Sequence, residues 1–345
     1  DSDEVLYYTG KVTISGQVSS ALSDSEYDTM SSFSSWGVPG SLQLKPEITA
    51  PGGNIYSVNG AVEGGKAYEN MSGTSMAAPQ VTGMVAVLAQ YLRENGLAEK
   101  TGVSARHLAQ SLLMSTAEPV VDGNSGSYYP VLQQGAGLAN VNSAIQADSY
   151  LTMAADATSG ATDGKVKVEL GDDPTKTGEY TFAYTLTNLK DEAAYYLFDT
   201  DVFTQDLFAY SGTIYLDTRT IELPAEVSYK VDDALVEAGS DYTDADVQAI
   251  LDYASGKGEL DEAQLTAYDL DGDGKVTTYD AHLAMNLSSN VAVKVPAGGS
   301  IAVEVTVKLS KDVKDYLDTY YTSGAYIEAY SYAKELSTEE GVQGT

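Results

Sequence analysis

The sequence predicts a multi-domain chain in which an incomplete α/β domain precedes an all-β sandwich, and a small helical insertion interrupts the sandwich. Three observations lead to this prediction. An apolar helical stretch follows a glycine-serine turn near residue 75, period-two alternation dominates after about residue 148, and it stops between about residues 224 and 290. With 345 residues, the chain is long enough for two or more domains that each bury a core.

The first predicted element is a helix over residues 75–91, rich in Ala, Met, Val and Leu. Gly73 permits a tight turn before it, and we expect the hydroxyl of Thr74 or Ser75 to cap it. The free N–H groups and the positive dipole end of such a helix would face an oxyanion formed beside Ser75. This arrangement indicates a nucleophile for acyl transfer.

Four further segments surround this motif in a characteristic order: residues 33–37 (FSSWG), 45–52 (KPEITAPG), a helix over 104–116, and 135–141 (GAGLANV). Together with residues 73–79 (GTSMAAP), they resemble the C-terminal half of the subtilisin-like serine protease (subtilase) domain, and specifically that of lactocepin-type cell-envelope proteinases. The resemblance covers about residues 28–147. It implies a portion of a parallel-sheet α/β domain with Ser75 as nucleophile, and a substrate cleft that includes Ser34, Ser35, Trp36, Gly37, Gly73 and Thr74.

The positions of the histidines bear on whether this chain alone can be catalytically active. In subtilases the catalytic triad occurs along the chain in the order Asp, His, Ser. Here no histidine precedes Ser75, since the two in the chain are His107 and His282. The family's oxyanion asparagine also falls before the first residue. We therefore expect a fragment of a longer protease that is inactive by itself, with apolar faces of residues 20–147 exposed. Residues 1–19, with short strands at 5–8 and 11–15, are assigned to the tail of a protease-associated insert, and residues 20–147 to the catalytic domain.

Alternating sequence indicates half-buried antiparallel strands after residue 148. The clearest are residues 180–187 and 301–309, with weaker ones at 165–170, 212–216 and 325–332. We assign residues 148–223 and 291–345 to a β-sandwich of fibronectin-III type, which also resembles the domain that follows the catalytic domain in lactocepin-type proteases. Its predicted role is that of a spacer or support.

The insertion, residues 224–290, contains a twelve-residue loop with carboxylates at positions 1, 3, 5 and 12, and Gly274 at the sharp turn. This spacing predicts a Ca²⁺ site, because crowded carboxylates repel one another unless a hard cation lies among them. The predicted ligands are Asp269, Asp271, Asp273, Lys275 through its carbonyl, Thr277 through a water, and Asp280. The loop resembles that of a dockerin, but a second ligand run is missing. A cohesin-like partner and a single stabilising calcium clip both stay open.

Composition excludes other classes of function. The formal charge of −31 disfavours nucleic acid and anionic membranes as partners. There is no cysteine and no long apolar segment, so neither disulfides nor a membrane span is expected.

Three functions stay open from the sequence. The first is part of an exported serine endopeptidase that cleaves proteins or peptides, located outside a Gram-positive-type bacterium or in its envelope. The second is a non-enzymatic, calcium-dependent scaffold, and the third an inactive protease homologue. Substrate preference, wall anchoring and oligomeric state do not follow from the sequence.

Overall fold

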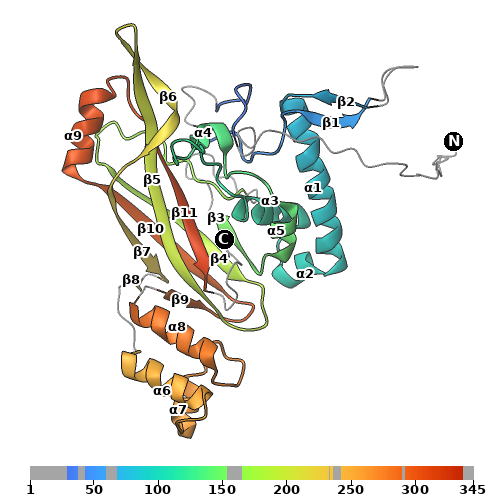
Figure 1. Cartoon of the computed structure of the whole chain (residues 1–345), viewed down its shortest axis with the longest axis vertical. Coiled ribbons are helices and arrows are strands. Elements are labelled where there is room, and N and C mark those ends of the chain that lie inside the picture. The colour runs from blue at the N-terminus through green and yellow to red at the C-terminus, as the bar shows by residue number, and fades with distance from the viewer. Residues whose placement is uncertain are drawn as a thin grey trace, which may run out of the picture.

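The computed structural model describes residues 29–37, 43–59, 68–153, 165–232, 234–235, 242–289 and 292–336. Figure 1 shows a helical part around α1, a sandwich of long strands beside it, and a small helical insertion at the far end of the sandwich. The predicted strands at 5–8 and 11–15, and the insert tail over residues 1–19, lie outside the described residues.

The first part is built around one long helix. Its elements are β1 (Ile55–Val58), β2 (Tyr68–Met71), α1 (Thr74–Glu94), α2 (Leu97–Thr101), α3 (Ala105–Ser115), α4 (Val131–Gln134) and α5 (Val141–Gln146). The predicted helices at 75–91 and 104–116 are thus α1 and α3, and Ser104 caps α3 by accepting the N–H of His107. Leu88 and Leu92 of α1 pack with Leu108 and Leu112 of α3 in one core.

The structure does not show the parallel sheet expected for this part among the described residues. β1 and β2 form an antiparallel pair, and within the described ranges the parallel pairing is confined to a bridge between Thr49 and Leu138. The expectation of exposed apolar faces holds for α1, where Val85 is 37% and Val87 50% exposed. A helix without a charged residue before Arg93 would normally be buried all round, and this one is buried on one side only.

Two antiparallel sheets form the second part. One has the order β3-β4-β10-β7-β8 and the other β11-β5-β6, with β9 also paired to β5. Their bounds are β3 (Ser149–Met153), β4 (Glu179–Asn188), β5 (Ala194–Tyr210), β6 (Thr213–Glu222), β7 (Ala225–Val231), β8 (Ala234–Leu235), β9 (Ala292–Val295), β10 (Ser300–Leu309) and β11 (Ile327–Glu335). A helix, α9 (Lys311–Tyr320), packs Val313 into the core between the sheets.

The alternating sequence identifies the buried face of this core. Five side chains of β10 point inward, all 5% exposed or less: Ile301, Val303, Val305, Val307 and Leu309. Residues 165–170, in contrast, are not a strand. They lie as an extended segment along residues 43–47, where Lys167 bonds to the Leu44 carbonyl and Glu169 accepts the Leu44 N–H at 2.8 Å.

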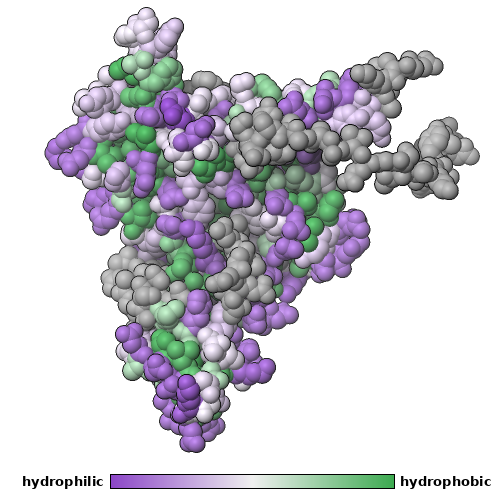
Figure 2. All heavy atoms as spheres, viewed as in Figure 1, coloured by the Kyte–Doolittle hydropathy of each residue, from purple (hydrophilic) through white to green (hydrophobic). Residues whose placement is uncertain are grey.

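The longest strand, β5, was not predicted, because its alternation is broken. It pairs with β11 and β9 along its first part and with β6 along its end. The hairpin between β5 and β6, with positive φ at Ser211 and Gly212, projects from the sandwich. Phe208 and Tyr215 stack there with ring centroids 5.5 Å apart. Figure 2 shows apolar surface on this projection at the upper left and also over the lower half of α1.

The helical insertion begins later than predicted. Residues 225–231 are strand β7, which pairs with β10 in the five-stranded sheet, so they belong with the strands and not with the insertion assigned from 224. The signal was present in the sequence, because residues 225–231 alternate strictly, with Val227, Tyr229 and Val231 on one face. The insertion contains α6 (Asp244–Ala254), α7 (Glu262–Ala267) and α8 (Thr278–Ser289), with Ile250, Leu270 and Leu283 in its core.

Candidate functional site

Ser75 lies exposed in the first turn of α1. The helix cap is Gly73, and no side chain caps the N–H groups, so the predicted capping by Thr74 or Ser75 is wrong. Gly73 has φ 156° and ψ 161°, a region that essentially only glycine adopts. The N–H groups of Met76 and Ala77 donate to the Gly73 carbonyl at 2.9 and 3.4 Å, which leaves those of Thr74 and Ser75 to face a developing negative charge beside Ser75.

The turn before Ser75 rests on residues 51–52. The N–H of Gly73 donates to the Gly52 carbonyl at 2.8 Å, and the Gln80 side-chain amide donates to the Pro51 carbonyl at 2.7 Å. A Cβ added to Gly52 would lie 2.9 Å from the Gly73 carbonyl oxygen and 3.2 Å from the Ala77 Cβ. The backbone of Gly52 is therefore in direct contact with both ends of the first turn.

The predicted cleft segment, residues 34–37, follows a residue that lies close to Gly53. A Cβ on Gly53 would be 3.5 Å from the Ser31 hydroxyl oxygen, and the N–H of Ser34 donates to the Ser31 carbonyl at 2.9 Å. Trp36 is 39% exposed and Ser35 is also exposed. Gly37 is buried, and its N–H donates to the carbonyl of Leu132 in α4 at 2.7 Å. The role of these residues in substrate binding stays a prediction.

Neither histidine supplies a base to Ser75. His107 is in the first turn of α3, and His282 lies in the insertion, where its ring stacks on Tyr279 with centroids 6.4 Å apart. In the part of the chain that the structure describes, the Ser75 hydroxyl is bonded to no histidine or carboxylate. A serine hydroxyl without such a partner is a weak nucleophile.

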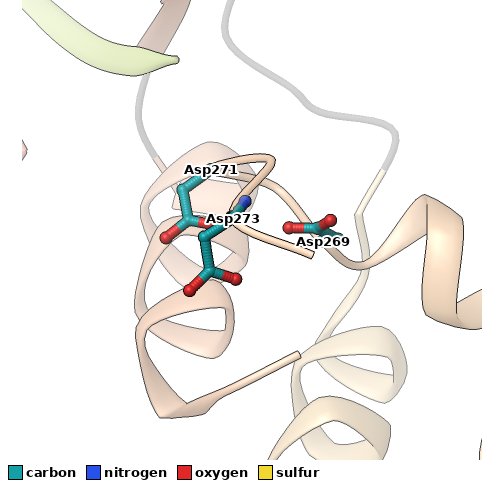
Figure 3. Close-up of side chains that lie close together, drawn as sticks. All are labelled: Asp269, Asp271 and Asp273. Atoms are coloured by element: carbon teal, nitrogen blue, oxygen red, sulfur yellow. Dashed lines mark hydrogen bonds between the residues drawn. The ribbon is translucent and has the colours of Figure 1, made fainter. Parts of the chain in front are cut away.

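Three predicted calcium ligands meet in the insertion. Each of Asp269, Asp271 and Asp273 offers one carboxylate oxygen, and these oxygens lie within 4.8 Å of one another (Figure 3). The loop is folded by its own backbone, since the N–H of Gly274 donates to Asp269 at 3.0 Å and φ of Gly274 is 85°. The second carboxylate oxygen of Asp269 is buried without a hydrogen-bond partner, which fits a position that faces a cation.

Asp280, a further predicted ligand, is placed differently. Asp280 is completely buried, and its carboxylate accepts the N–H groups of Leu270 at 2.8 Å and Thr277 at 2.7 Å instead of joining the three aspartates. Lys275 donates its N–H to Asp273 at 2.7 Å, and the Thr277 hydroxyl donates to Asp280 at 3.1 Å. The roles of the Lys275 carbonyl and of Thr277 as ligands stay predictions. Burial, together with the charges of the neighbouring aspartates, raises the pKa of Asp271 to about 6. A bound cation would remove this repulsion.

Sequence reasoning missed a polar contact between the sandwich and α4. Glu328 of β11 is 8% exposed, and its carboxylate accepts the N–H groups of Val131 at 3.2 Å and Leu132 at 3.1 Å, at the start of α4. Burial raises its pKa to about 7, while the two N–H groups act in the opposite direction. Two strand positions further, the Tyr330 hydroxyl donates to the Gly135 carbonyl at 2.7 Å. The available signal was the position of Glu328 on the same strand face as Tyr330 and Tyr332.

The sequence comparisons concern the part of the chain that contains Ser75. Residues 8–147 match the model of the subtilase family. Over this range, which is less than half of the chain, the sequence is similar to subtilases. The "PII-type proteinase" of Lacticaseibacillus paracasei is 35% identical over 230 residues, which cover 63% of this chain and 11% of the relative. The "C5a peptidase" of Streptococcus pyogenes is 38% identical over 123 residues, 36% of this chain and 10% of the relative.

This subtilase segment is followed by sequence that the proteinases share. Because 63% of 345 residues is about 217, the similarity to the PII-type proteinase extends at least about 70 residues past residue 147, into the strands of the sandwich. The "PIII-type proteinase" of Lactococcus lactis subsp. cremoris (strain SK11) gives the same coverage of this chain at 34% identity. The chain spans about a tenth of the length of these relatives. No helix among the described residues has the length and apolar character to cross a membrane.

Proposed function

We propose that this chain is part of a serine endopeptidase that cleaves proteins or peptides through an acyl-enzyme on Ser75. The observation that carries the proposal is the exposed hydroxyl of Ser75 in an uncapped helical turn, within a segment of the subtilase family. The relatives named above are proteinases and peptidases, which favours this function over a non-enzymatic scaffold.

The chain supplies one part of the catalytic machinery. The Ser75 oxygen attacks the carbonyl carbon of the peptide bond, and its proton passes to a histidine outside this sequence, oriented by an aspartate that is also outside it. The N–H groups at the start of α1 and an asparagine from the same missing part then stabilise the oxyanion. Expulsion of the amine and hydrolysis of the acyl-enzyme by water complete the cycle.

The remaining residues support this unit. Residues 148–232 and 292–336 are proposed to be a fibronectin-III-like sandwich, and residues 242–289 a calcium-binding insertion. Asp269, Asp271 and Asp273 would hold Ca²⁺, with the buried, unpaired Asp269 oxygen as the supporting observation. The proposed location is outside a Gram-positive-type cell or in its envelope, supported by the bacterial organisms of the relatives and by the acidic composition.

A fluorophosphonate probe tests the nucleophile. In a protein that contains this chain together with its upstream reading frame, we expect Ser75 to be labelled and Ser75→Ala to lose about a millionfold in turnover. Ser72→Ala is the matched control, because Ser72 is also exposed but accepts the Asn54 N–H at 2.8 Å. This chain alone should remain unlabelled. Full activity of Ser75→Ala would contradict the proposal.

Calcium is tested by thermal unfolding of the chain. Addition of Ca²⁺ should raise the melting temperature of the insertion and EDTA should lower it, because an ion that binds only the folded state stabilises it by mass action. Asp269→Asn should abolish the difference, whereas Asp261→Asn, which keeps an oxygen to accept the Gln264 N–H, should retain it. Identical curves with Ca²⁺ and EDTA for the unaltered chain would disprove the site.

A further inference from the structure

We propose that strand β11 of the sandwich positions the first turn of α1, which carries Ser75, and that Tyr330 and Glu328 are the positioning residues. The inference rests on the proposed function only in taking Ser75 as the nucleophile. Three successive contacts carry it, from β11 to α4, from the end of α4 to residues 47–49, and from residues 51–52 to the first turn of α1.

The first contact joins the sandwich to α4. Glu328 and Tyr330 are two positions apart on β11, so both side chains leave the same face of the sheet. The Glu328 carboxylate fixes the start of α4 and the Tyr330 hydroxyl fixes Gly135 directly after its end. One strand thus fixes both ends of a four-residue helix.

Aromatic packing excludes water from this contact. The rings of Tyr128, Phe203 and Tyr330 lie with centroids 5.3 to 5.5 Å apart, and Val131 packs in the same cluster. The Thr220 hydroxyl on β6 also donates to the Tyr128 carbonyl at 2.8 Å. Hydrogen bonds in such surroundings are stronger than at an exposed surface, and a partner left without its bond is costly.

The second contact is made almost entirely by backbone. Thr49 donates its N–H to the Gly137 carbonyl and accepts the N–H of Ala139, both at 2.8 Å, and its hydroxyl donates to the Gln134 carbonyl at 2.8 Å. The N–H of Ala136 donates to the Glu47 carbonyl at 3.0 Å. A displacement of residues 134–139 therefore moves residues 47–49 with it.

The third contact reaches the nucleophile. Residues 51–52 are separated from Thr49 by Ala50 alone, and they hold Gly73 and Gln80 by hydrogen bonds at 2.8 and 2.7 Å. The far end of α1 is fixed by a different core, through Leu88 and Leu92. The exposed first turn depends on residues 51–52 for its position, and a misplacement of about 1 Å at a reacting group can cost about a hundredfold in rate.

Hydrogen exchange on this chain and kinetics on the proteinase that contains it test the proposal. Tyr330→Phe removes one hydroxyl and should raise exchange of the Thr49 and Gly73 amides at least about tenfold. Tyr321→Phe is the matched control, because the Tyr321 hydroxyl is equally buried and donates to a backbone carbonyl, that of Gln205, at the same 2.7 Å, but inside the sandwich. The control should leave both amides unchanged.

In the proteinase, Tyr330→Phe should lower kcat about tenfold with KM nearly unchanged, while Tyr321→Phe alters neither. Equal exchange at Gly73 in the unaltered chain and in Tyr330→Phe would overturn the proposal, as would an equal rise in both variants. Unchanged kcat in an active Tyr330→Phe enzyme would overturn it too. The proposed function fails by a separate result, which is retention of activity by Ser75→Ala. The exchange measurement still decides whether β11 positions the first turn of α1.

Discussion

Neutralising Glu328 is expected to remove a pH-dependent loss of stability. Burial raises the pKa of this carboxyl from 4.5 to about 7 in the folded chain. The folded state then binds the proton more tightly than the unfolded state, so the stabilisation is fully present below pH 4.5. It is lost as the pH rises to about 7, and changes little above that value.

The magnitude follows from the pKa. A difference of one in pKa corresponds to 1.36 kcal/mol, so a rise from 4.5 to about 7 corresponds to about 3 kcal/mol. Burial is the main cause, and the N–H groups of Leu132 and Val131 reduce it. Tyr330, two positions along β11, has its own pKa raised by burial and by the charge of Glu328.

Glu328→Gln keeps the shape and one accepting oxygen but cannot ionise. Its free energy of unfolding minus that of the unaltered chain should rise by about 3 kcal/mol between pH 4 and pH 8. Urea unfolding at a series of pH values measures both curves, and taking their difference cancels the other carboxyl groups. Glu222→Gln, at an exposed site on β6, is the control and should give a flat difference. A flat difference for Glu328→Gln would refute the reasoning.

Three further substitutions probe the packing. Gly135→Ala should lower the free energy of unfolding by more than about 1 kcal/mol in urea, because φ is +65° and the new Cβ would lie 2.5 Å from the Pro46 carbonyl oxygen; unchanged stability would contradict this contact. Leu283→Ala, at a completely buried site in the insertion, should cost about 2–5 kcal/mol and lower the melting temperature of that part. Val87→Asn should stay within about 0.5 kcal/mol of the unaltered chain by the same measurement, since Val87 is half exposed on α1; a large loss would show that this face is covered.

Local sequence was sufficient for elements whose signal is continuous. The stretch rich in Ala, Met, Val and Leu predicted α1, and strict alternation over residues 301–309 predicted both β10 and its buried face. The aspartate spacing predicted that Asp269, Asp271 and Asp273 would lie together, because loop geometry over five residues depends on near neighbours. It did not predict that Asp280 would bond to the loop backbone instead, which depends on how α8 packs.

Tertiary structure decided everything that depends on distant partners. β5 has a broken alternation because its start and its middle meet different neighbours, the insertion at Tyr195 and α4 at Phe203. The extended residues 165–170 bind residues 43–47 in place of a strand, a pairing about 120 residues apart in sequence. In the sequence Glu328 is indistinguishable from an exposed strand glutamate, and its contact with α4 depends on the tertiary structure.

The sequence by itself determined the chemistry of this protein: a serine at a helix start, an acidic loop and a set of alternating strands. Their positions relative to one another came only from the tertiary structure, which connects β11 to Ser75 through α4 and residues 47–52. The physical reason is the distance along the sequence over which each kind of interaction acts. Residue type and spacing fix conformation over a few residues, whereas burial, backbone hydrogen bonding and pKa depend on which distant segments exclude water from a site.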